Sequence, residues 1–251
     1  MKFASLGSGS KGNATLVEDG HSSLLIDCGF SVKETERRLS RLGRSAEDLS
    51  GILVTHEHGD HIRGVLPLAR KYCLPVYMTA GTANTLKSPH HKLKIIDSHN
   101  SFQCASMTVI PVAVPHDARE PVQYLVNDGR HTLGVLTDLG HISSHVAEQY
   151  ANCDGLLLEA NHDHAMVSNG PYPPRLKQRV GGDWGHLSNT QSRELLEHVA
   201  LGRLQHLVLA HISEQNNHPE KVQEAVAGLE KQVAALHIAC QSEGFGWLSL
   251  E

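Results

Sequence analysis

Aromatic residues and paired cysteines are both scarce in this sequence of 251 residues. Phe, Trp and Tyr make up only 4% of the chain, so we expect a core of aliphatic side chains and no aromatic platform for stacking the bases of single strands. The five cysteines lie far apart and form no Cys-x-x-Cys pair, which argues against a disulfide framework and against a thiolate zinc site. They are expected to be reduced and mostly buried.

Long apolar runs and an excess of basic charge are also missing. No segment has the length and apolar character of a membrane span or a signal peptide, so we expect a cytoplasmic protein without a membrane partner. The formal charge of −5 argues against a uniformly positive surface but leaves a local basic groove open. The length and the ordinary share of hydrophobic residues, 40%, favour one domain over residues 1–251.

The order of strand-like and helix-like segments predicts a layered α/β (α+β) fold. Short strands separated by Gly and Ser fill the first third, and strands then alternate with helices, which is typical of sheets covered by helices. Strands are expected at 2–7, 13–18, 22–29, 51–56, 107–116, 155–160 and 204–211, with a hairpin of 123–127 and 131–138 around Asp128-Gly129. Helices are expected at 31–43 with a capping box of Ser31 and Glu34, from Asp60 onward, at 190–200 and at 219–236. Residues 168–185 are expected to form a long irregular loop.

The segment from Ile52 to Gly64, ILVTHEHGDHIRG, places three histidines and an aspartate within six residues. Crowded imidazoles repel once protonated, so the pattern indicates that a cation lies among them. In His-x-His-x-Asp-His, His56 and His58 can face one ion while Asp60 and His61 face a second. Imidazole and carboxylate are ligands that zinc, manganese and iron accept.

Three later strands supply further candidate ligands. His116, Asp138 and His211 each stand as the first polar group after an apolar strand, where a sheet would deliver them to a shared edge. For each residue on its own, a capping or hydrogen-bonded role is an alternative to metal ligation. Their recurrence beside the histidine cluster favours ligation.

Gly7, Gly9 and Gly12 also spell Gly-x-Gly-x-x-Gly with Asp27 downstream, but NATLVE favours a strand where a dinucleotide site needs a helix.

THEHGDH followed by VPH, TDLG and AHIS resembles the metallo-β-lactamase superfamily, whose fold is a four-layer αββα sandwich of two mixed sheets flanked by helices. GSGSKGNATLVE, LLIDCG, LLEANHD, GHLSN and AHISEQNN are similar to its YycJ (WalJ) branch, regarded as DNA exonucleases linked to repair. The resemblance implies two divalent ions, zinc or else manganese or iron. It makes His56, His58 and His116 ligands of one ion, Asp60, His61 and His211 ligands of the other, and Asp138 the bridge.

Two such ions can lower the pKa of a shared water from about 15.7 toward about 7, so a bridging hydroxide would attack phosphorus, with Asp60 counted among the catalytic residues. GHLS at 185–188 is similar to an element of ribonuclease Z relatives whose histidine contacts phosphate and donates a proton. His186 is therefore expected to be catalytic and Glu159 to orient it. His162 is a rival donor, and a helix cap near Thr190 is the alternative role for His186.

Substrate contacts are expected from polar and basic residues near these motifs: Ser188, Asn189, His162, Arg175, Lys177 and Arg179. A second basic run contains Lys87, His90, His91, Lys92 and Lys94, and both sets have solvated surface as their alternative role. The stretch between Asp138 and His211 is too short for the β-CASP cap of RNA-processing relatives, so an open cleft is expected.

The favoured function is a metal-dependent DNA exonuclease of 5′ to 3′ polarity. One alternative is a small-molecule metallo-hydrolase of cyclic phosphodiesters or thioesters, similar to glyoxalase II. Another is a metal-bound nucleic-acid-binding module without turnover. Formation of a homo-oligomer is left open.

Overall fold

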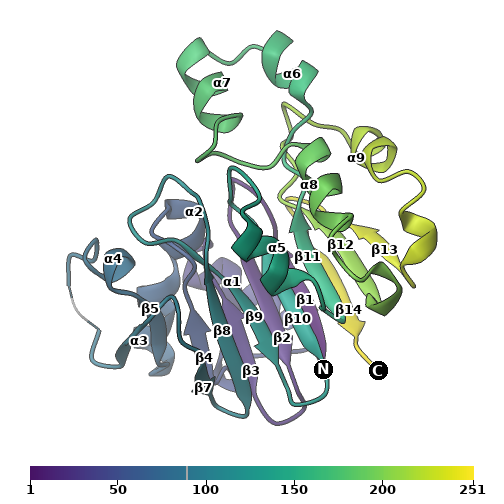
Figure 1. Cartoon of the computed structure of the whole chain (residues 1–251). Coiled ribbons are helices and arrows are strands. Elements are labelled where there is room, and N and C mark those ends of the chain that lie inside the picture. The colour runs from purple at the N-terminus through teal and green to yellow at the C-terminus, as the bar shows by residue number, and fades with distance from the viewer. Residues whose placement is uncertain (89) are drawn as a thin grey trace.

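Two seven-stranded sheets pack face to face in the computed structural model, which describes residues 1–88 and 90–251 (Figure 1). The strand orders are β14-β1-β2-β3-β4-β5-β6 and β13-β12-β11-β10-β9-β8-β7. The strands are β1 (Lys2–Gly7), β2 (Ala14–Glu18), β3 (Ser23–Ile26), β4 (Gly51–Leu53), β5 (Val76–Thr79), β6 (Leu93–Ile96), β7 (Phe102–Cys104), β8 (Met107–Ala113), β9 (Val122–Asn127), β10 (Thr132–Leu136), β11 (Gly155–Glu159), β12 (His206–Ala210), β13 (Leu236–Ile238) and β14 (Phe245–Ser249).

Helices cover the outer face of each sheet, so the predicted sandwich of mixed sheets flanked by helices is confirmed. The helices are α1 (Val32–Arg41), η1 (Ala46–Asp48), α2 (Gly59–Ile62), α3 (Val65–Tyr72), α4 (Ala80–Ala83), α5 (Ser144–Tyr150), α6 (His164–Asn169), α7 (Pro174–Val180), α8 (Asn189–Leu196), η2 (Leu201–Arg203), α9 (Pro219–Ala225) and η3 (Glu230–Gln232). Figure 1 shows α6 and α7 standing away from the sheets at one end of the molecule.

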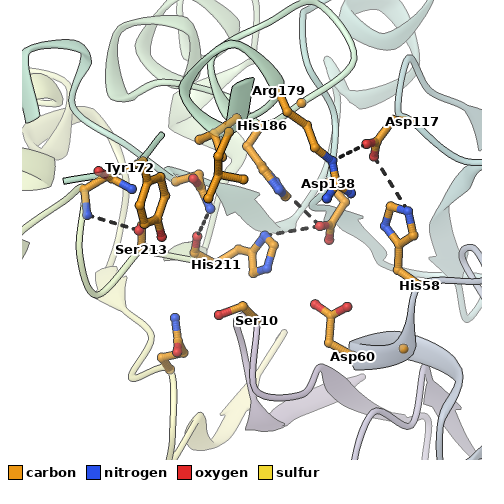
Figure 2. A pocket seen from close by; sticks show the side chains of 17 residues that line it. Ser10, His58, Asp60, Asp117, Asp138, Tyr172, Arg179, His186, His211 and Ser213 are labelled. Carbon is orange, nitrogen blue, oxygen red and sulfur yellow. Dashed lines mark hydrogen bonds and ion pairs between the residues drawn. The ribbon is translucent and has the colours of Figure 1, made fainter. Parts of the chain in front are cut away.

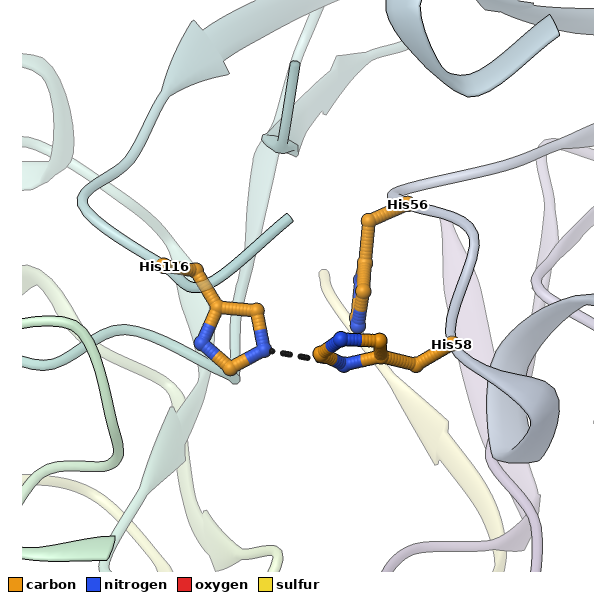
Figure 3. A group of neighbouring side chains, drawn as sticks. All are labelled: His56, His58 and His116. Carbon is orange, nitrogen blue, oxygen red and sulfur yellow. Dashed lines mark hydrogen bonds between the residues drawn. The ribbon is translucent and has the colours of Figure 1, made fainter. Parts of the chain in front are cut away.

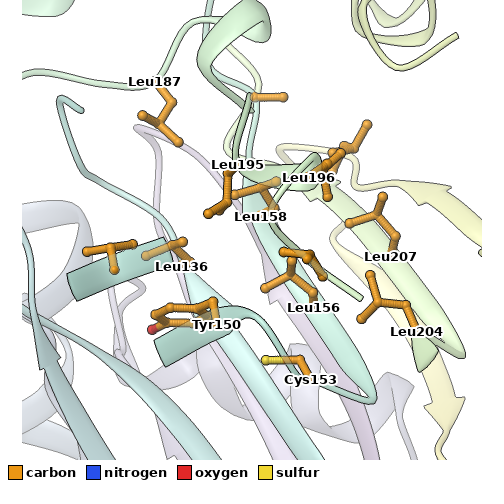
Figure 4. Packing of buried hydrophobic residues seen from close by; sticks show 14 of the residues in the cluster. Leu136, Tyr150, Cys153, Leu156, Leu158, Leu187, Leu195, Leu196, Leu204 and Leu207 are labelled. Carbon is orange, nitrogen blue, oxygen red and sulfur yellow. The ribbon is translucent and has the colours of Figure 1, made fainter. Parts of the chain in front are cut away.

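Three mainly aliphatic clusters hold the layers together, as the scarcity of aromatic residues predicts, and each also contains at least one aromatic ring, such as Tyr124 or Tyr150. One lies between the sheets and joins side chains such as Leu24 of β3 to Val208 of β12. A second packs α1 and α3 onto the first sheet. The third packs α5, α8 and α9 onto the second sheet, where Leu158 of β11 meets Leu195 of α8 (Figure 4). Burial of such apolar surface is the main term that favours folding.

The strand directions bring distant chain segments to one edge. In the second sheet β10, β11 and β12 are parallel, and β8 runs the same way because β8 and β10 are both antiparallel to β9. In the first sheet β3 and β4 are parallel. Carboxyl ends of parallel strands meet at the same edge, where α/β proteins build their sites.

Two predicted helices differ from the structure because of glycine. The helix expected from Asp60 is divided into α2 and α3 at Gly64, where a Cβ would lie 2.0 Å from the carbonyl oxygen of Phe30. The helix expected over 219–236 ends at Ala225, since Gly228 adopts a φ of +88° and a left-handed residue ends a helix.

The prediction of an irregular loop at 168–185 is also wrong, because this segment contains α7, which begins directly after Pro173. Proline is well tolerated in the first turn of a helix, where its missing N–H has no partner in any case. At α1, Ser31 caps the helix by accepting from Glu34 N. The Glu34 carboxylate completes no capping box and instead binds Arg37 and Arg38.

Within residues 1–88 and 90–251, no helix combines the length and the apolar character needed to traverse a bilayer.

Candidate metal centre and active site

The seven predicted metal ligands lie together at one edge of the sandwich, although they come from four separate chain segments. His56 and His58 follow β4, Asp60 and His61 lie in α2, and His116, Asp138 and His211 follow β8, β10 and β12. Potential ligand atoms of the seven residues lie within 4.8 Å of one another in three overlapping groups: His56, His58 and His116; Asp60, His61 and His211; and His56, His61 and Asp138. Asp138 and His211 also form a fourth such group with Glu159 and His186. The membership of Asp138 in the third group places its carboxylate between the other two.

The first group consists of three imidazoles that face a common point (Figure 3). The ring of His56 lies 4.6 Å from that of His58 and 4.9 Å from that of His116, measured between centroids. His116 Nδ1 donates to the carbonyl of Gly185 at 3.0 Å, which leaves Nε2 directed at the group. His56 is 0% exposed, and its Nε2 has no hydrogen-bond partner among the described residues.

The second group surrounds the Asp138 carboxylate. Asp138 Oδ2 lies 3.3 Å from His61 Nε2, and Oδ1 lies 3.4 Å from His211 Nδ1. Asp60 Oδ2 is 3.6 Å from the same nitrogen of His61, which the amide of Asn13 also contacts at 2.9 Å. Asp138 is 2% exposed, so the protein places a carboxylate out of water beside the imidazoles.

Asp27 fixes the orientation of His61, a role that the motif spacing does not predict. Its carboxylate accepts hydrogen bonds from Thr55 N at 2.9 Å, from the Thr55 hydroxyl at 2.8 Å and from His61 Nδ1 at 2.8 Å. A ring held through Nδ1 presents Nε2, which is how proteins orient metal-binding imidazoles. The available signal is the one shared by Asp138: Asp27 is the first polar residue after the apolar strand β3.

Glu159, at the end of β11, holds two histidines at once. Its Oε1 accepts from His186 Nδ1 at 2.9 Å and from His211 Nδ1 at 2.7 Å. Its Oε2 accepts from Leu187 N at 2.9 Å and Leu139 N at 3.3 Å. The predicted contact with His186 is thus present, whereas the contact with His211 is an addition. Ser188, not His186, caps α8, so the alternative role of His186 as helix cap is wrong.

Backbone strain is concentrated at this edge. Five non-glycine residues of the described chain have a positive φ, and three of them are Asp27 (62°), Asp138 (56°) and His211 (53°). Each directly follows or lies close behind a strand, and each turns a side chain toward the cluster. Left-handed conformations of such residues are uncommon and occur preferentially at functional sites.

Burial and charge set complementary protonation states. Burial lowers the pKa of His56 well below its ordinary value and also lowers the pKa of His116. Burial opposes ionisation of Asp138 and Glu159, but the adjacent imidazoles outweigh it, so the pKa of Asp138 is well below its ordinary value and that of Glu159 is about 2. The same carboxylates outweigh burial at His211 and raise its pKa to about 9. The cluster therefore favours added positive charge.

These residues fit divalent metal ions. Neutral imidazoles and ionised carboxylates are the forms that bind metal, and the cluster contains both. Buried polar atoms normally have partners, yet His56 Nε2 and Asp138 Oδ2 accept no hydrogen bond within the described chain. A cation between the two groups would satisfy both atoms.

A pocket of about 400 Å³ opens beside the cluster (Figure 2). His58, Asp60, Asp138, His186 and His211 line it, whereas the more deeply placed His56 and His61 do not. The cluster therefore has one face that a substrate can reach.

Comparison with known proteins agrees with the fold and the cluster. The model of the beta-lactamase superfamily domain matches residues 23–212. The chain belongs to this superfamily. The segment matched contains all seven candidate ligands together with Glu159 and His186.

The superfamily members most similar in sequence include the exodeoxyribonuclease WalJ of Streptococcus pneumoniae, 36% identical over 86% of this chain and 83% of that protein. The exodeoxyribonuclease YycJ of Bacillus anthracis is 34% identical over 90% of this chain and 88% of that protein. Among solved structures, the metallo-beta-lactamase fold protein YhfI of Bacillus subtilis superposes with a TM-score of 0.75 at 17% identity, covering 99% of both chains. The predicted superfamily, its YycJ (WalJ) branch and the fold are thus confirmed.

Of the predicted substrate contacts, one lines the pocket and the others do not. Arg179 lines the pocket. Ser188 and Asn189 are buried away from it, the first capping α8 and the second pairing with Asn217. His162 is 1% exposed and does not line the pocket. Of the basic residues, Arg175 is exposed and Lys177 Nζ donates to Ser168 O, while the run at Lys87, His90, His91, Lys92 and Lys94 lies around β6, away from the pocket lining.

Arg179 of α7 is connected to the cluster through Asp117, another residue that the motifs do not predict. The guanidinium donates to Asp117 Oδ2 at 2.6 Å, and Asp117 Oδ1 lies 3.7 Å from His58 Nε2. The chain segment that carries α7 is thereby anchored over the pocket by an ion pair (Figure 2).

Proposed function

We propose that the protein is a metal-dependent DNA exonuclease of 5′ to 3′ polarity that takes part in DNA repair. The observation that carries the proposal is the arrangement around Glu159, which holds a candidate ligand, His211, and the pocket-lining His186 on one carboxylate oxygen. A hydrolase of a phosphodiester needs a proton donor such as His186 next to its metal centre, because the leaving oxygen must receive a proton. The names of the two relatives that match most of the chain support DNA as the substrate.

Two metal ions are proposed, with His56, His58 and His116 binding one, Asp60, His61 and His211 binding the other, and Asp138 shared. When bound, divalent ions supply a Lewis acid for phosphoryl oxygens and lower the pKa of a nearby water. Zinc, manganese and iron all accept this set of nitrogen and oxygen ligands.

The protein groups around the centre have separate tasks. As the imidazolium, His186 keeps its Nδ1–H hydrogen-bonded to Glu159 and donates the proton on Nε2 to the leaving oxygen. Glu159 accepts from Nδ1 of His186 and of His211, so Nε2 of His211 is left free to bind metal and Nε2 of His186 is left free to act on the substrate. Asp27 does the same for His61. Arg179 supplies positive charge at the pocket and can exchange Asp117 for a phosphate of the incoming strand, because a guanidinium binds phosphate with paired hydrogen bonds.

The test is a comparison of substrates with defined metal content. Protein stripped with a chelator and reloaded with Zn²⁺ or Mn²⁺ is given single- and double-stranded DNA labelled at either end, RNA, and a chromogenic phosphodiester. Mononucleotides released progressively from the 5′ end of DNA support the proposal, and release from the 3′ end refutes its polarity. Cleavage of the small ester alone selects the small-molecule hydrolase, and salt-sensitive DNA binding without products selects the binding module.

A matched pair of variants assigns the proton donor. His186→Ala is expected to retain metal and to lose about 10²- to 10⁴-fold in turnover of DNA, the usual contribution of general acid catalysis. His198→Ala removes an exposed histidine that does not line the pocket and is expected to behave as wild type. Wild-type turnover in His186→Ala removes His186 from the mechanism.

A further inference from the structure

The pocket has two chemically different ends. One end carries the metal ligands and the Arg179–Asp117 pair. The other end is lined by uncharged polar side chains and one aromatic ring: Ser10, Asn161, Tyr172, Ser213, Asn216 and Gln241. Figure 2 shows Tyr172 and Ser213 beyond His211, on the side away from Asp117 and His58.

Two amides at this uncharged end have unused hydrogen-bonding groups. Asn216 is 0% exposed, and neither Nδ2 nor Oδ1 has a partner within the described chain. Its backbone is fixed, because its N–H donates to Ser213 Oγ at 3.1 Å and its carbonyl accepts from Asp163 N at 2.9 Å. Gln241 Nε2 donates to Ile212 O at 3.0 Å, while its Oε1 is buried without a partner. Buried polar groups are seldom left unpaired. The uncharged end is therefore suited to a ligand that both donates and accepts hydrogen bonds.

The aromatic ring is Tyr172, in the segment between α6 and α7. It is half-buried and lines the pocket together with Leu176 of α7. A ring in this position offers a flat apolar face, on which a nucleobase stacks regardless of its sequence. The low aromatic content of the chain predicts no stacking platform, so the position of this ring is a feature that composition does not reveal.

We propose that the uncharged end of the pocket is a nucleoside subsite that holds the terminal nucleoside of the DNA strand, an inference that rests on the proposed nuclease function. The base stacks on Tyr172 and turns its donor and acceptor edge toward Asn216 and Gln241. The next phosphate then lies at the metal end, beside His186.

A terminal phosphate is the competing occupant, and its chemistry does not fit. An ionised phosphate offers only acceptors, whereas Asn216 Oδ1 and Gln241 Oε1 require donors. Among the described residues that line this end, none is a lysine or an arginine. Lys11, next to Ser10 in the sequence, is bound to Glu214 at 2.8 Å, so its charge is already paired.

The kinetic test combines variants with a modified strand. Tyr172→Ala is expected to raise KM for single-stranded DNA about tenfold to a hundredfold, the effect of losing one base–aromatic stack, and Tyr172→Phe to restore it. A strand whose terminal nucleoside lacks its base is expected to bind wild type and Tyr172→Ala equally. Gln178→Ala, an exposed position of α7 outside the pocket lining, is the matched control and is expected to keep the wild-type KM.

Two results would overturn the subsite: a wild-type KM in Tyr172→Ala, or a terminal phosphate that tightens binding at least tenfold whether or not Tyr172 is present. Calorimetric titration with deoxyadenosine separates this inference from the nuclease proposal. Binding that depends on Tyr172 without any degradation of DNA keeps the subsite and refutes the nuclease. Degradation without dependence on Tyr172 refutes the subsite alone.

Discussion

Replacing Glu159 by glutamine changes one buried atom and should disable the centre. The carboxylate accepts four hydrogen bonds, two at each oxygen: from His186 and His211, and from the backbone of Leu187 and Leu139. A carboxamide has a single acceptor oxygen. Whichever way it turns, its NH₂ group faces either two imidazoles or two backbone N–H groups.

The expected loss of folding free energy follows from the number of hydrogen bonds that the carboxamide cannot accept. A hydrogen bond to a charged group contributes about 1.5–3 kcal/mol, so losing two of the four costs about 3–6 kcal/mol. For a chain of this size, about 2–4 °C of Tm corresponds to each kcal/mol. If the imidazoles change tautomer to accept from the amide, Nε2 becomes protonated and metal affinity falls by about 10- to 100-fold, as for other groups that orient ligands.

Three quantities are measured for wild type, Glu159→Gln and Glu18→Gln: the Tm of thermal unfolding, the metal content, and the rate at which a chromogenic phosphodiester is hydrolysed. Glu18 is the matched control because its carboxylate is also buried, but it binds Arg44 and Lys2 on the first sheet, away from the pocket lining. Glu18→Gln should lower Tm and leave metal content and hydrolysis rate unchanged. Wild-type Tm, metal content and rate in Glu159→Gln would refute the reasoning.

The other predictions concern backbone space, acid stability, thiols and metal. Gly29→Ala places a Cβ 1.8 Å from the Asp60 carbonyl and should lower both Tm and metal affinity, while Gly59→Ala, with no atom within 4 Å, should be tolerated; equal Tm values would contradict this. Burial raises the pKa of Glu18, but its bonds to Arg44 and Lys2 outweigh burial and lower it; its stabilisation is therefore present above about pH 4.3 and lost as pH falls through the folded pKa, so the Tm difference between wild type and Glu18→Gln should shrink in acid. Cys28 is buried and its pKa is raised to about 11, so iodoacetamide should label exposed Cys240 first and Cys28 only after unfolding, as peptide mass analysis would show. Chelation should lower Tm, and free metal at 100 times its Kd should restore about 2.7 kcal/mol, measured by calorimetry.

Local patterns predicted most of the sheets and the positions of the ligands. Alternation and turn residues identify short strands such as β9 and β10, because both signals act over a few neighbouring residues. The rule that a polar residue directly after an apolar strand lies at the sheet edge brought His116, Asp138 and His211 to the histidine cluster. The same rule applies to Asp27, but the dinucleotide-like glycine pattern and the LLIDCG motif that contain it do not by themselves predict its contact with His61.

Helix lengths and substrate contacts could not be predicted in the same way. The helix expected from Asp60 is divided at Gly64 because the N–H of Gly64 donates to the carbonyl of Cys28, distant in sequence, at 2.7 Å; the carbonyl of Phe30 fills the space that a side chain would need there. Ser188 and Asn189 belong to a recognisable motif, yet packing of α8 buries both. Tyr172 lines the pocket through the placement of the segment that carries α7, and Arg179 of α7 meets Asp117 there; no local pattern specifies this placement.

The sequence by itself determined the chemistry: which imidazoles and carboxylates are present, and the order in which strands deliver them. These features are local, since they depend on residue type and on spacing within one segment. Only the tertiary structure decided that Glu159 joins His186 to His211, that Asp27 orients His61, and that an uncharged wall faces the metal ligands across one pocket. Each of those relations needs two segments to meet, and the place where they meet is set by the packing of both sheets and their helices.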